Sequence, residues 1–291
     1  MRTEKWLSLN TESLLGRTVA VTGTTGGLGR ELLKYLCSLG ASVILVDRNK
    51  ERSAAFRDEL IAKYGVSARC INADLEDMES VKAATRELIL SSPDIFIHNA
   101  GAYSIPRHKC ESGYDNLFQI NFVSPYYMIR ELLPTLRERG GRVMVVGSIA
   151  HNYSKIDPES IDFSDRRKNS LAYGNAKRHL MFSLYELFRS EDRVTLSVTH
   201  PGITFTNITA HYPKLIFAII KYPMKIIFMK PARAALCLLR GIFDGCGYHE
   251  WIGPRVFDIW GLPRKKLLRT VSEAEGALIA ARAEEIYDKL K

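Results

Sequence analysis

Tyr173 and Lys177 are the residues of this sequence whose types and spacing most directly suggest acid–base chemistry. They stand four residues apart in a stretch with apolar side chains at helical intervals, so both are expected on one face of a helix. A lone tyrosine has a pKa near 10 and is a poor base at neutral pH. A nearby ammonium group favours the tyrosinate and lowers that pKa. The pair therefore predicts a proton donor and acceptor, although this spacing also arises by chance.

A glycine-rich turn offers a second kind of chemistry, the binding of phosphate. The segment 18–40, TVAVTGTTGGLGRELLKYLCSLG, begins with an apolar run typical of a strand covered on both faces. Four glycines follow, and then leucines at helical spacing up to Gly40. Glycines let a pyrophosphate approach the backbone, and the N-terminus of a helix attracts the anion. The alternative interpretation is a tight strand-to-helix turn with no ligand.

Alternating strands and helices must position these residues. Short apolar runs predict strands at 19–21, 42–46, 67–71, 95–98, 142–146 and 194–199, with 250–252 as the last strand. Helical patterns lie between them at 50–64, 78–90, 171–190 and 232–243, and a C-terminal helix follows at 272–290. In the long helix that ends near Arg139, Pro125 and Pro134 predict a kink or a local start. The short alternations imply right-handed crossovers and a doubly wound parallel α/β sheet.

In such a sheet a ligand lies across the carboxyl ends of the strands. Asp47 ends the second strand 18 residues after Gly29, where a carboxylate can accept hydrogen bonds from an adenosine ribose. The adjacent Arg48 suits a 2′-phosphate instead. Because a carboxylate repels a phosphate, the pair favours NAD, with NADP as the alternative. Asp74 suits the adenine amino group, the N-cap of the next helix, or both.

Composition excludes several classes of function. The 291 residues carry a net charge of +9, but the basic residues are spread out, which favours solvated surface over a nucleic-acid site. The five cysteines lack metal-type spacing, so we expect free thiols and no metal site. The N-terminus lacks a signal-peptide pattern, and no uncharged run reaches the length of a membrane span. These features predict a cytoplasmic protein.

Taken in order, the strand ends and the Tyr-Lys pair resemble the short-chain dehydrogenase/reductase family in its core, non-extended form. The matching residues cover about 17–206 and are Thr22, Gly23, Gly27, Gly29, Asp74, Asn99, Ala100, Gly101, Asn121, Ser148, Tyr173, Lys177, Pro201 and Gly202. The resemblance implies a single Rossmann-type domain over 1–291. Within it, 17–206 forms the cofactor and catalytic core, 205–245 a helical lid over the substrate, and 270–291 a C-terminal helix.

The resemblance also implies roles for individual residues. Tyr173 is the acid/base, and Lys177 tunes its pKa and binds the nicotinamide ribose. Ser148 orients the substrate oxygen, and Asn121 holds a water that relays protons. The implied cofactor-binding residues are Gly23, Thr25, Gly27, Leu28, Gly29, Asp47, Arg48, Asp74, Leu75, Asn99, Ala100, Gly101, Tyr173, Lys177, Pro201, Gly202, Thr204 and Thr206.

Within the family, the retinol-dehydrogenase-like group is the most similar. It has a wide gap between serine and tyrosine, as between Ser148 and Tyr173, and similar sequence around both. That group usually prefers NADP and has a basic residue after the second strand, as Arg48 is here. Asp47 departs from its pattern, so NAD(H) stays slightly preferred and NADP(H) stays open.

Two alternatives belong to other classes. Gly23, Gly26 and Gly29 also fit the turn of NAD-dependent epimerases and dehydratases, but these need more C-terminal chain. A non-catalytic dinucleotide-binding protein has no need of the complete serine, tyrosine and lysine set. His151 and His200 lie near the site in sequence, where we expect them to anchor backbone or pack in the core.

The segment after Gly202 predicts the substrate side. Its apolar and aromatic content suggests an apolar alcohol or ketone of steroid, retinoid or long-chain type. Packing against the core or a second subunit is an equal alternative. Because lysines interrupt the apolar residues of 214–230, peripheral contact with a membrane surface is a third. The resemblance also implies a homodimer or homotetramer, paired through the helices that carry Tyr173 and the Asn121 segment.

Overall fold

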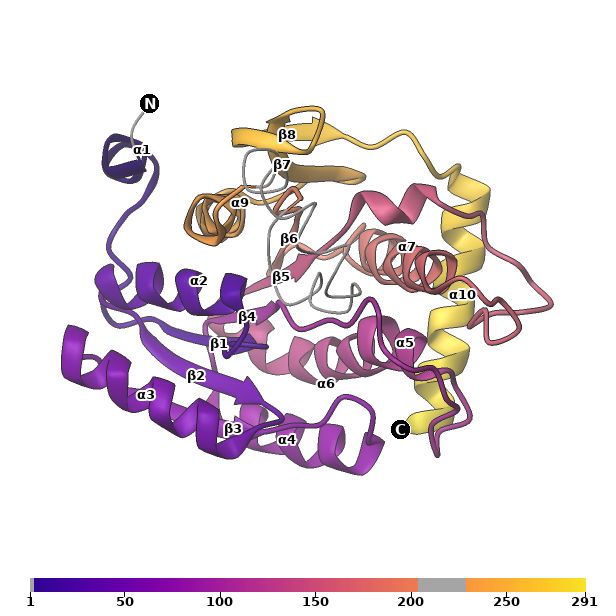
Figure 1. Ribbon diagram of the computed structural model, residues 1–291, viewed down its shortest axis with the longest axis horizontal. Coiled ribbons are helices and arrows are strands. Elements are labelled where there is room, and N and C mark those ends of the chain that lie inside the picture. Colours follow the sequence, from indigo (N-terminus) through magenta and orange to yellow (C-terminus); the bar gives the residue numbers. More distant parts are fainter. Residues whose placement is uncertain (1–2, 204–228) are drawn as a thin grey trace, which may run out of the picture.

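The computed structural model describes residues 3–203 and 229–291. Within them, one sheet has the strand order β3-β2-β1-β4-β5-β6-β7-β8 (Figure 1). Its strands are β1 (Thr18–Thr22), β2 (Ser42–Asp47), β3 (Ala68–Asn72), β4 (Ile95–His98), β5 (Arg142–Val146), β6 (Thr195–Thr199), β7 (Glu250–Val256) and β8 (Trp260–Leu267). The pairs from β3 through β7 are parallel, and β8 is antiparallel to β7.

Helices cover both faces of the sheet (Figure 1). One layer contains α1 (Thr3–Asn10), α2 (Gly27–Ser38), α3 (Lys50–Tyr64) and α9 (Pro231–Phe243). The other contains α4 (Met78–Ser91), α5 (Asn116–Phe118), α6 (Ser124–Arg139), α7 (Asn169–Leu187) and α10 (Glu273–Leu290). Each layer has its own buried apolar cluster against the sheet. This arrangement explains the continuous apolar strands, since both of their faces are buried.

The strand order reverses between β1 and β4, which is the switch point of a doubly wound sheet. Val19, Ala20 and Val21 of β1 are fully buried there. The carboxyl ends of β1, β4 and β5 therefore meet at one edge, and this edge carries most of the predicted site residues. The predicted α/β doubly wound fold is confirmed.

The long helix that was expected to end near Arg139 is divided. A π-helical turn at Gln119–Val123 separates α5 from α6, and Pro125 lies in the first turn of α6. The Ser124 N–H at the start of α6 bonds the Gln119 carbonyl oxygen, so the helical backbone continues from the π-helical turn into α6. Near Pro125 the structure thus shows a change of helix type at Gln119–Val123, where a kink or a local start was expected, and Pro134 lies inside α6.

The prediction that 250–252 forms the last strand is wrong, because β8 follows it. The hairpin turn between β7 and β8 has Phe257 and Asp258 at positive φ, without a glycine to signal it. β8 also contains Pro263 and three consecutive basic residues, which weaken its strand pattern. Among the described strands β8 is the outermost on its side of the sheet, with no strand partner on one of its edges, and such an edge tolerates both features.

Several predictions concern residues outside the described part of the chain. Thr204 and Thr206, the membrane-contact segment up to residue 228 and most of the expected lid 205–245 fall there and stay predictions. The described end of that lid belongs to α9, which packs against α2. The expected C-terminal helix is present as α10, and the single-domain organisation of 1–291 stays a prediction.

Helix α10 runs across α6 and α7 and contacts both (Figure 1). Arg130 of α6 forms an ion pair with Glu284 at 2.9 Å, and Arg178 of α7 forms one with Glu275 at 2.7 Å. The Tyr126 hydroxyl also donates to Glu284. The resemblance implied that α6 and α7 pair with a second copy. Where α10 contacts them, this surface is already covered by the same chain.

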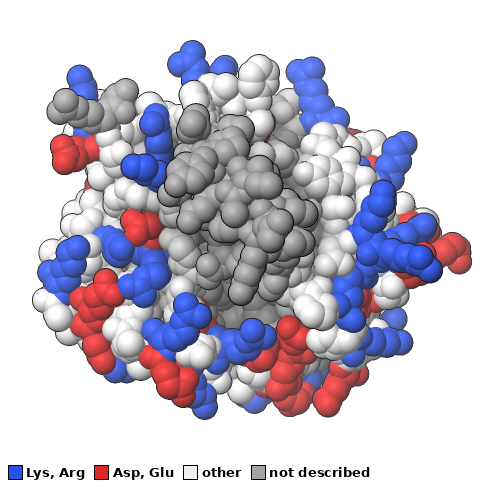
Figure 2. Space-filling view, in the orientation of Figure 1, with Lys and Arg blue, Asp and Glu red and all other residues white. Residues whose placement is uncertain are grey.

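The described surface adds two observations. Figure 2 shows basic and acidic side chains interspersed around the visible face, so that face has no large patch of one sign. This agrees with the expectation that most basic residues are solvated surface. None of the described helices combines the length and the apolar character needed to cross a membrane.

Candidate active site

The glycine turn between β1 and α2 is held by contacts that only glycine allows. Gly23 has a φ of +71°, and a Cβ atom there would lie 2.8 Å from the Cα of Ala100. A Cβ atom on Gly29 would lie 2.3 Å from the Gly23 carbonyl oxygen. Gly27 begins α2, whose N-terminal N–H groups are therefore presented beside the turn. The turn has the open backbone that a pyrophosphate requires.

The end of β4 is bonded directly to this turn. The Asn99 side-chain amide donates to the carbonyl oxygens of Thr22 at 3.0 Å and Gly23 at 2.9 Å. The Thr22 hydroxyl accepts from the backbone N–H groups of Asn99 and Ala100. Asn99 therefore fixes the spacing of β1 and β4 through its side chain, and Gly101 follows at the exposed edge.

Asp47 is in place at the end of β2, but its carboxylate is already bonded within the protein. It accepts from the Thr24 hydroxyl, from the Thr25 N–H at 3.2 Å and from the Ser53 hydroxyl at 3.2 Å. Only 5% of Asp47 is exposed. In this structure Asp47 thus connects the glycine turn to α3, a role that the sequence did not predict.

Asp74 lies near Arg48 rather than at a helix cap. Its carboxylate accepts from the Glu76 N–H at 3.1 Å, whereas Asp77 caps α4, so the predicted N-cap role of Asp74 is wrong. The largely exposed Arg48 guanidinium lies 3.9 Å from Asp74 and 3.6 Å from Glu76. Leu75 is buried, and its carbonyl oxygen accepts from the Ser124 hydroxyl at 2.7 Å.

Ser148, Tyr173 and Lys177 come together at the end of β5. Ser148 is hydrogen-bonded to the Tyr173 side chain, and its own oxygen also accepts from the Ala150 N–H at 3.2 Å. The Lys177 ammonium nitrogen donates to the Val146 carbonyl oxygen at 2.9 Å. It lies 5.8 Å from the centre of the Tyr173 ring. The predicted spacing on one helical face therefore brings both α7 side chains to the serine.

Burial dominates the acid–base properties of this group. It raises the pKa of Tyr173 to about 12, while the hydrogen bond with Ser148 acts to lower it. Burial also lowers the pKa of Lys177 to about 8. The expected lowering of the Tyr173 pKa by Lys177 is not seen in this structure, because the cost of burying a tyrosinate is larger.

Asn121 lies in the π-helical turn and faces the same space. Its side-chain amide donates to the carbonyl oxygens of Ala102 and Leu117, both at 2.8 Å. Its own carbonyl oxygen is buried and has no protein partner among the described residues. A Cβ atom on Gly101 would lie 2.8 Å from this oxygen and 3.6 Å from the Lys177 nitrogen. A buried acceptor beside a buried ammonium is compatible with the predicted water relay.

Sequence reasoning missed three residues around Tyr173. The Tyr103 ring meets the Tyr173 ring edge-on at 5.0 Å, and Tyr153 is half exposed nearby. A Cβ atom on Gly174 would lie 2.3 Å from the Ala150 carbonyl oxygen, so glycine lets α7 approach Ser148 and the turn Ile149–Asn152 that follows it, here called the serine loop. The position of Gly174, directly after Tyr173 in a helical pattern, was the available signal.

Pro201 and Gly202 follow the carboxyl end of β6. Gly202 has a φ of +79°, and a Cβ atom there would lie 2.5 Å from the Ile259 carbonyl oxygen, so it allows close contact with the β7–β8 hairpin. Pro201 before it is partly exposed.

The two histidines near the site in sequence, His151 and His200, are both buried. His151 bonds the backbone carbonyl oxygen of Ser148 at 2.6 Å, which confirms the expectation of a backbone-anchoring histidine.

Comparison with known proteins places this site in a family. The sequence model described as short chain dehydrogenase matches residues 17–158. A Streptomyces sp. (strain C5) protein described as a candidate daunorubicin C-13 ketoreductase is 31% identical over 201 residues, covering 67% of this chain and 68% of that protein. The chain belongs to the short-chain dehydrogenase family. Retinol dehydrogenase 14 of Mus musculus is 31% identical over 212 residues, covering 67% of this chain but only 64% of that protein.

Solved structures show the same short-chain dehydrogenase fold. An uncharacterised protein of Mycobacterium paratuberculosis superposes with a TM-score of 0.78 at 24% identity, covering 97% of each chain. Pseudomonas aeruginosa RhlG, solved as an NADP active-site complex, has a TM-score of 0.60 at 26% identity. That alignment covers 80% of this chain and 91% of RhlG.

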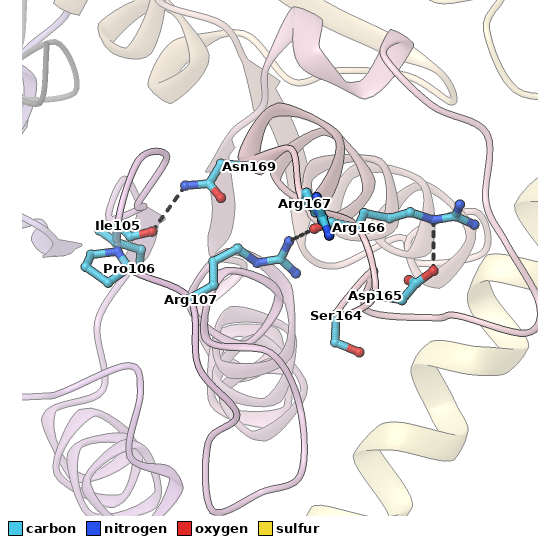
Figure 3. A pocket seen from close by; sticks show the side chains of 8 residues that line it. All are labelled: Ile105, Pro106, Arg107, Ser164, Asp165, Arg166, Arg167 and Asn169. Carbon is cyan, nitrogen blue, oxygen red and sulfur yellow. Dashed lines mark hydrogen bonds and ion pairs between the residues drawn. The ribbon is translucent and has the colours of Figure 1, made fainter.

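A polar cavity of about 450 Å³ lies between two loops of this short-chain dehydrogenase (Figure 3). Arg107 joins the loops by donating to the backbone carbonyl oxygens of Phe163 and Arg166. Asn169 at the start of α7 donates to the Ile105 carbonyl oxygen at 3.1 Å. The lining includes none of the predicted catalytic residues, so we assign the cavity no role in catalysis.

Replacing the buried Lys177 by an uncharged residue is expected to stabilise the folded protein. Because the folded protein lowers its pKa from 10.5 to about 8, the ionised lysine costs stability below pH 8, by roughly 3 kcal/mol. That cost disappears as the pH rises from about 8 to 10.5. We therefore expect Lys177→Met to be the more stable protein at pH 7, with a smaller advantage at pH 9.5. Urea unfolding at both pH values checks this, and an unchanged difference would contradict it.

Proposed function

We propose that this protein is an NAD(P)-dependent oxidoreductase that interconverts an apolar alcohol and the corresponding carbonyl compound. The observation that carries the proposal is the cluster of Ser148, Tyr173 and Lys177. Two hydrogen-bonded hydroxyl groups, one of them a phenol, lie beside a buried ammonium group at the carboxyl end of β5. Family membership supports the same reaction class.

The residues present fit a dinucleotide. The turn at Gly23 and Gly29 leaves backbone open where a pyrophosphate would lie, and the N-terminus of α2 is next to it. The unpartnered Asn121 oxygen and the Lys177 ammonium face the space beside Gly101, where a ribose would find polar partners. When bound, the nicotinamide supplies or accepts the hydride.

The chain's own residues then handle the substrate oxygen and its proton. Ser148 and Tyr173 are close enough for both hydroxyl groups to bond one oxygen atom, which orients the carbonyl group. Tyr173 donates its proton to that oxygen during reduction and accepts it during oxidation. Lys177, held by the Val146 carbonyl oxygen, places a positive charge beside the ring and so stabilises the transient tyrosinate.

Among the two dinucleotides we propose a preference for NAD(H). The end of β2 presents one guanidinium, Arg48, near the carboxylates of Asp47, Asp74 and Glu76. A 2′-phosphate here would meet more negative than positive charge. Asp47 acts here through its negative charge, and not as the hydrogen-bond acceptor for the ribose that the sequence suggested, because its oxygens bond the glycine turn. RhlG, in contrast, was solved with NADP.

Neutralising Asp47 tests this preference. We expect Asp47→Asn to bind NADPH about tenfold more tightly than the wild type, because one repelling charge is lost while the shape is kept. NADH affinity should change less. Calorimetric titration of both dinucleotides measures the two effects. If Asp47→Asn weakened the binding of both dinucleotides equally, Asp47 would be only a structural support for the turn.

We propose an apolar substrate, of retinoid, steroid or long-chain type. The aromatic rings of Tyr103 and Tyr153 flank Tyr173 on the described side. The residues that follow Gly202 are rich in apolar side chains in the sequence. The relative retinol dehydrogenase 14 is named after retinol, an apolar alcohol, and this supports the same substrate class here.

The proposal is tested in two steps. First, NADH and NADPH are titrated into the wild type and into Tyr173→Phe, and we expect at least one of them to bind both proteins. If neither dinucleotide bound, the proposed oxidoreductase activity would be refuted. Second, retinal, a steroid ketone and a long-chain ketone are screened with the preferred dinucleotide. Turnover that depends on Tyr173 identifies the substrate class, and turnover of only small polar ketones would overturn the apolar assignment.

A further inference from the structure

His151 is bonded at both ring nitrogens and is completely buried. Its Nδ1 lies 2.6 Å from the Ser148 carbonyl oxygen, and its Nε2 lies 3.0 Å from the Thr270 hydroxyl oxygen. A carbonyl oxygen can only accept, so Nδ1 carries the proton and Nε2 accepts from the threonine. Burial and the nearby Arg178 lower the pKa of His151, which keeps the ring neutral. The ring therefore links the backbone of Ser148 to the segment before α10.

Arg178 closes this link around the histidine. Its guanidinium donates to the carbonyl oxygens of His151 at 2.8 Å and Thr270 at 2.9 Å, and to the Glu275 carboxylate at 2.7 and 2.9 Å. The Arg178 side chain is only 4% exposed. One side chain on α7, directly after Lys177, thus joins the serine loop to the C-terminal segment.

The ring of His151 is also fixed from the side. Trp251 of β7 meets it edge-on at 5.7 Å, and Phe182 of α7 packs against it at 5.8 Å. His200 stacks against Trp251, with the ring centres 5.0 Å apart. A ring held by two hydrogen bonds and two aromatic neighbours has little freedom to turn.

We propose that His151 is a positioning residue that sets the direction of the Ser148 hydroxyl group, and that Thr270, in the segment before α10, and Arg178 of α7 hold it in place. This rests on the proposed function, since it concerns the serine of that site. Ser148 has extended backbone, at φ −151° and ψ 146°, and its side chain leaves the chain next to the carbonyl group that His151 holds. Rotation of that peptide would turn the hydroxyl away from Tyr173.

The first test removes the ring. We expect His151→Leu to lower kcat about 10- to 100-fold, the cost of misplacing a reacting group by a fraction of an ångström. KM for the ketone and the affinity for the dinucleotide should stay within about twofold. Thr270→Val should lower kcat in the same direction but less, and Thr270→Ser should restore it because the hydroxyl group is kept. An unchanged kcat in His151→Leu would overturn the proposal.

His179 provides a matched control. It is buried on α7, and its Nδ1 lies 2.9 Å from a backbone carbonyl oxygen, that of Asn175, but it packs against Phe118 and Phe122 instead of the serine loop. His179→Leu therefore removes the same kind of bond from a buried ring. It should reduce thermal stability without the loss of kcat. An equal loss of kcat in both variants would show that removing any buried histidine near α7 has this effect.

A spectroscopic readout separates this proposal from the proposed function. The ¹³Cζ resonance of Tyr173, assigned with Tyr173→Phe, reports the hydrogen bond with Ser148, and Ser148→Ala gives its unbonded position. In His151→Leu the resonance should move to that position, and in His179→Leu it should not. A resonance that stays unmoved in His151→Leu would refute positioning. If the wild type bound a dinucleotide but reduced no ketone, the proposed function would fail while this measurement still decides the role of His151.

Discussion

Tyr173→Phe is expected to lower turnover by about 10²- to 10⁴-fold, the usual contribution of a positioned proton donor. The phenylalanine ring keeps the shape that packs against Tyr103, so the fold should be preserved. Dinucleotide affinity should stay within about twofold. The loss should therefore appear in kcat, as for an interaction that is made in the transition state.

Steady-state kinetics with the substrate found by screening measure this effect. Tyr35→Phe is a suitable control, because Tyr35 also has a half-buried hydroxyl group, bonded to the Ala232 carbonyl oxygen at 3.1 Å, on the opposite layer of the sheet. It should retain full activity. If Tyr173→Phe kept more than about a tenth of the turnover, another group would have to supply the proton.

Two glycines of the same turn should respond very differently to alanine. A Cβ atom at position 29 would lie 2.3 Å from the Gly23 carbonyl oxygen and 2.9 Å from the Cα of Thr24, and neither backbone atom can move aside cheaply. We expect Gly29→Ala to lose about 1–3 kcal/mol of stability and all measurable dinucleotide binding, because the turn must open.

Gly26→Ala is the matched comparison. Gly26 has an ordinary φ of −80°, and a Cβ atom there would lie 3.6 Å from the Gly23 carbonyl oxygen, an ordinary contact. We expect its melting temperature to be unchanged, while the added methyl group at the start of α2 weakens NADH binding. Thermal melting and NADH titration of both variants separate the two effects. Equal melting temperatures would mean that the backbone around Gly29 can adapt.

The sequence predicted best the parts of the fold that depend on local pattern. Apolar runs located the strands of the parallel sheet, and the four-residue spacing placed Tyr173 and Lys177 on one face of α7. The doubly wound parallel sheet then followed from general rules of connection, although the order of its strands was not predicted. These predictions needed no knowledge of how distant side chains pack.

What the sequence could not predict depends on contacts between distant residues. Asp47 looked free to bind a ribose, but the threonines of the glycine turn and Ser53 of α3 bond its oxygens. The pKa of Tyr173 depends on how deeply α7 is buried, which periodicity does not report. β8 was missed because its proline and its basic residues are tolerated only in an outermost strand.

The contact of α10 with α6 and α7 bears on how the protein responds to dilution. In an assembly of separate chains, support for the catalytic helix obeys mass action and weakens as the subunits separate. Here Glu275 forms an ion pair with α7 and Glu284 one with α6, and both glutamates belong to the same chain as these helices. The support from α10 therefore does not depend on the protein concentration. We expect the specific activity to remain constant from micromolar to low nanomolar protein. A fall over that range would mean that Tyr173 depends on a second copy.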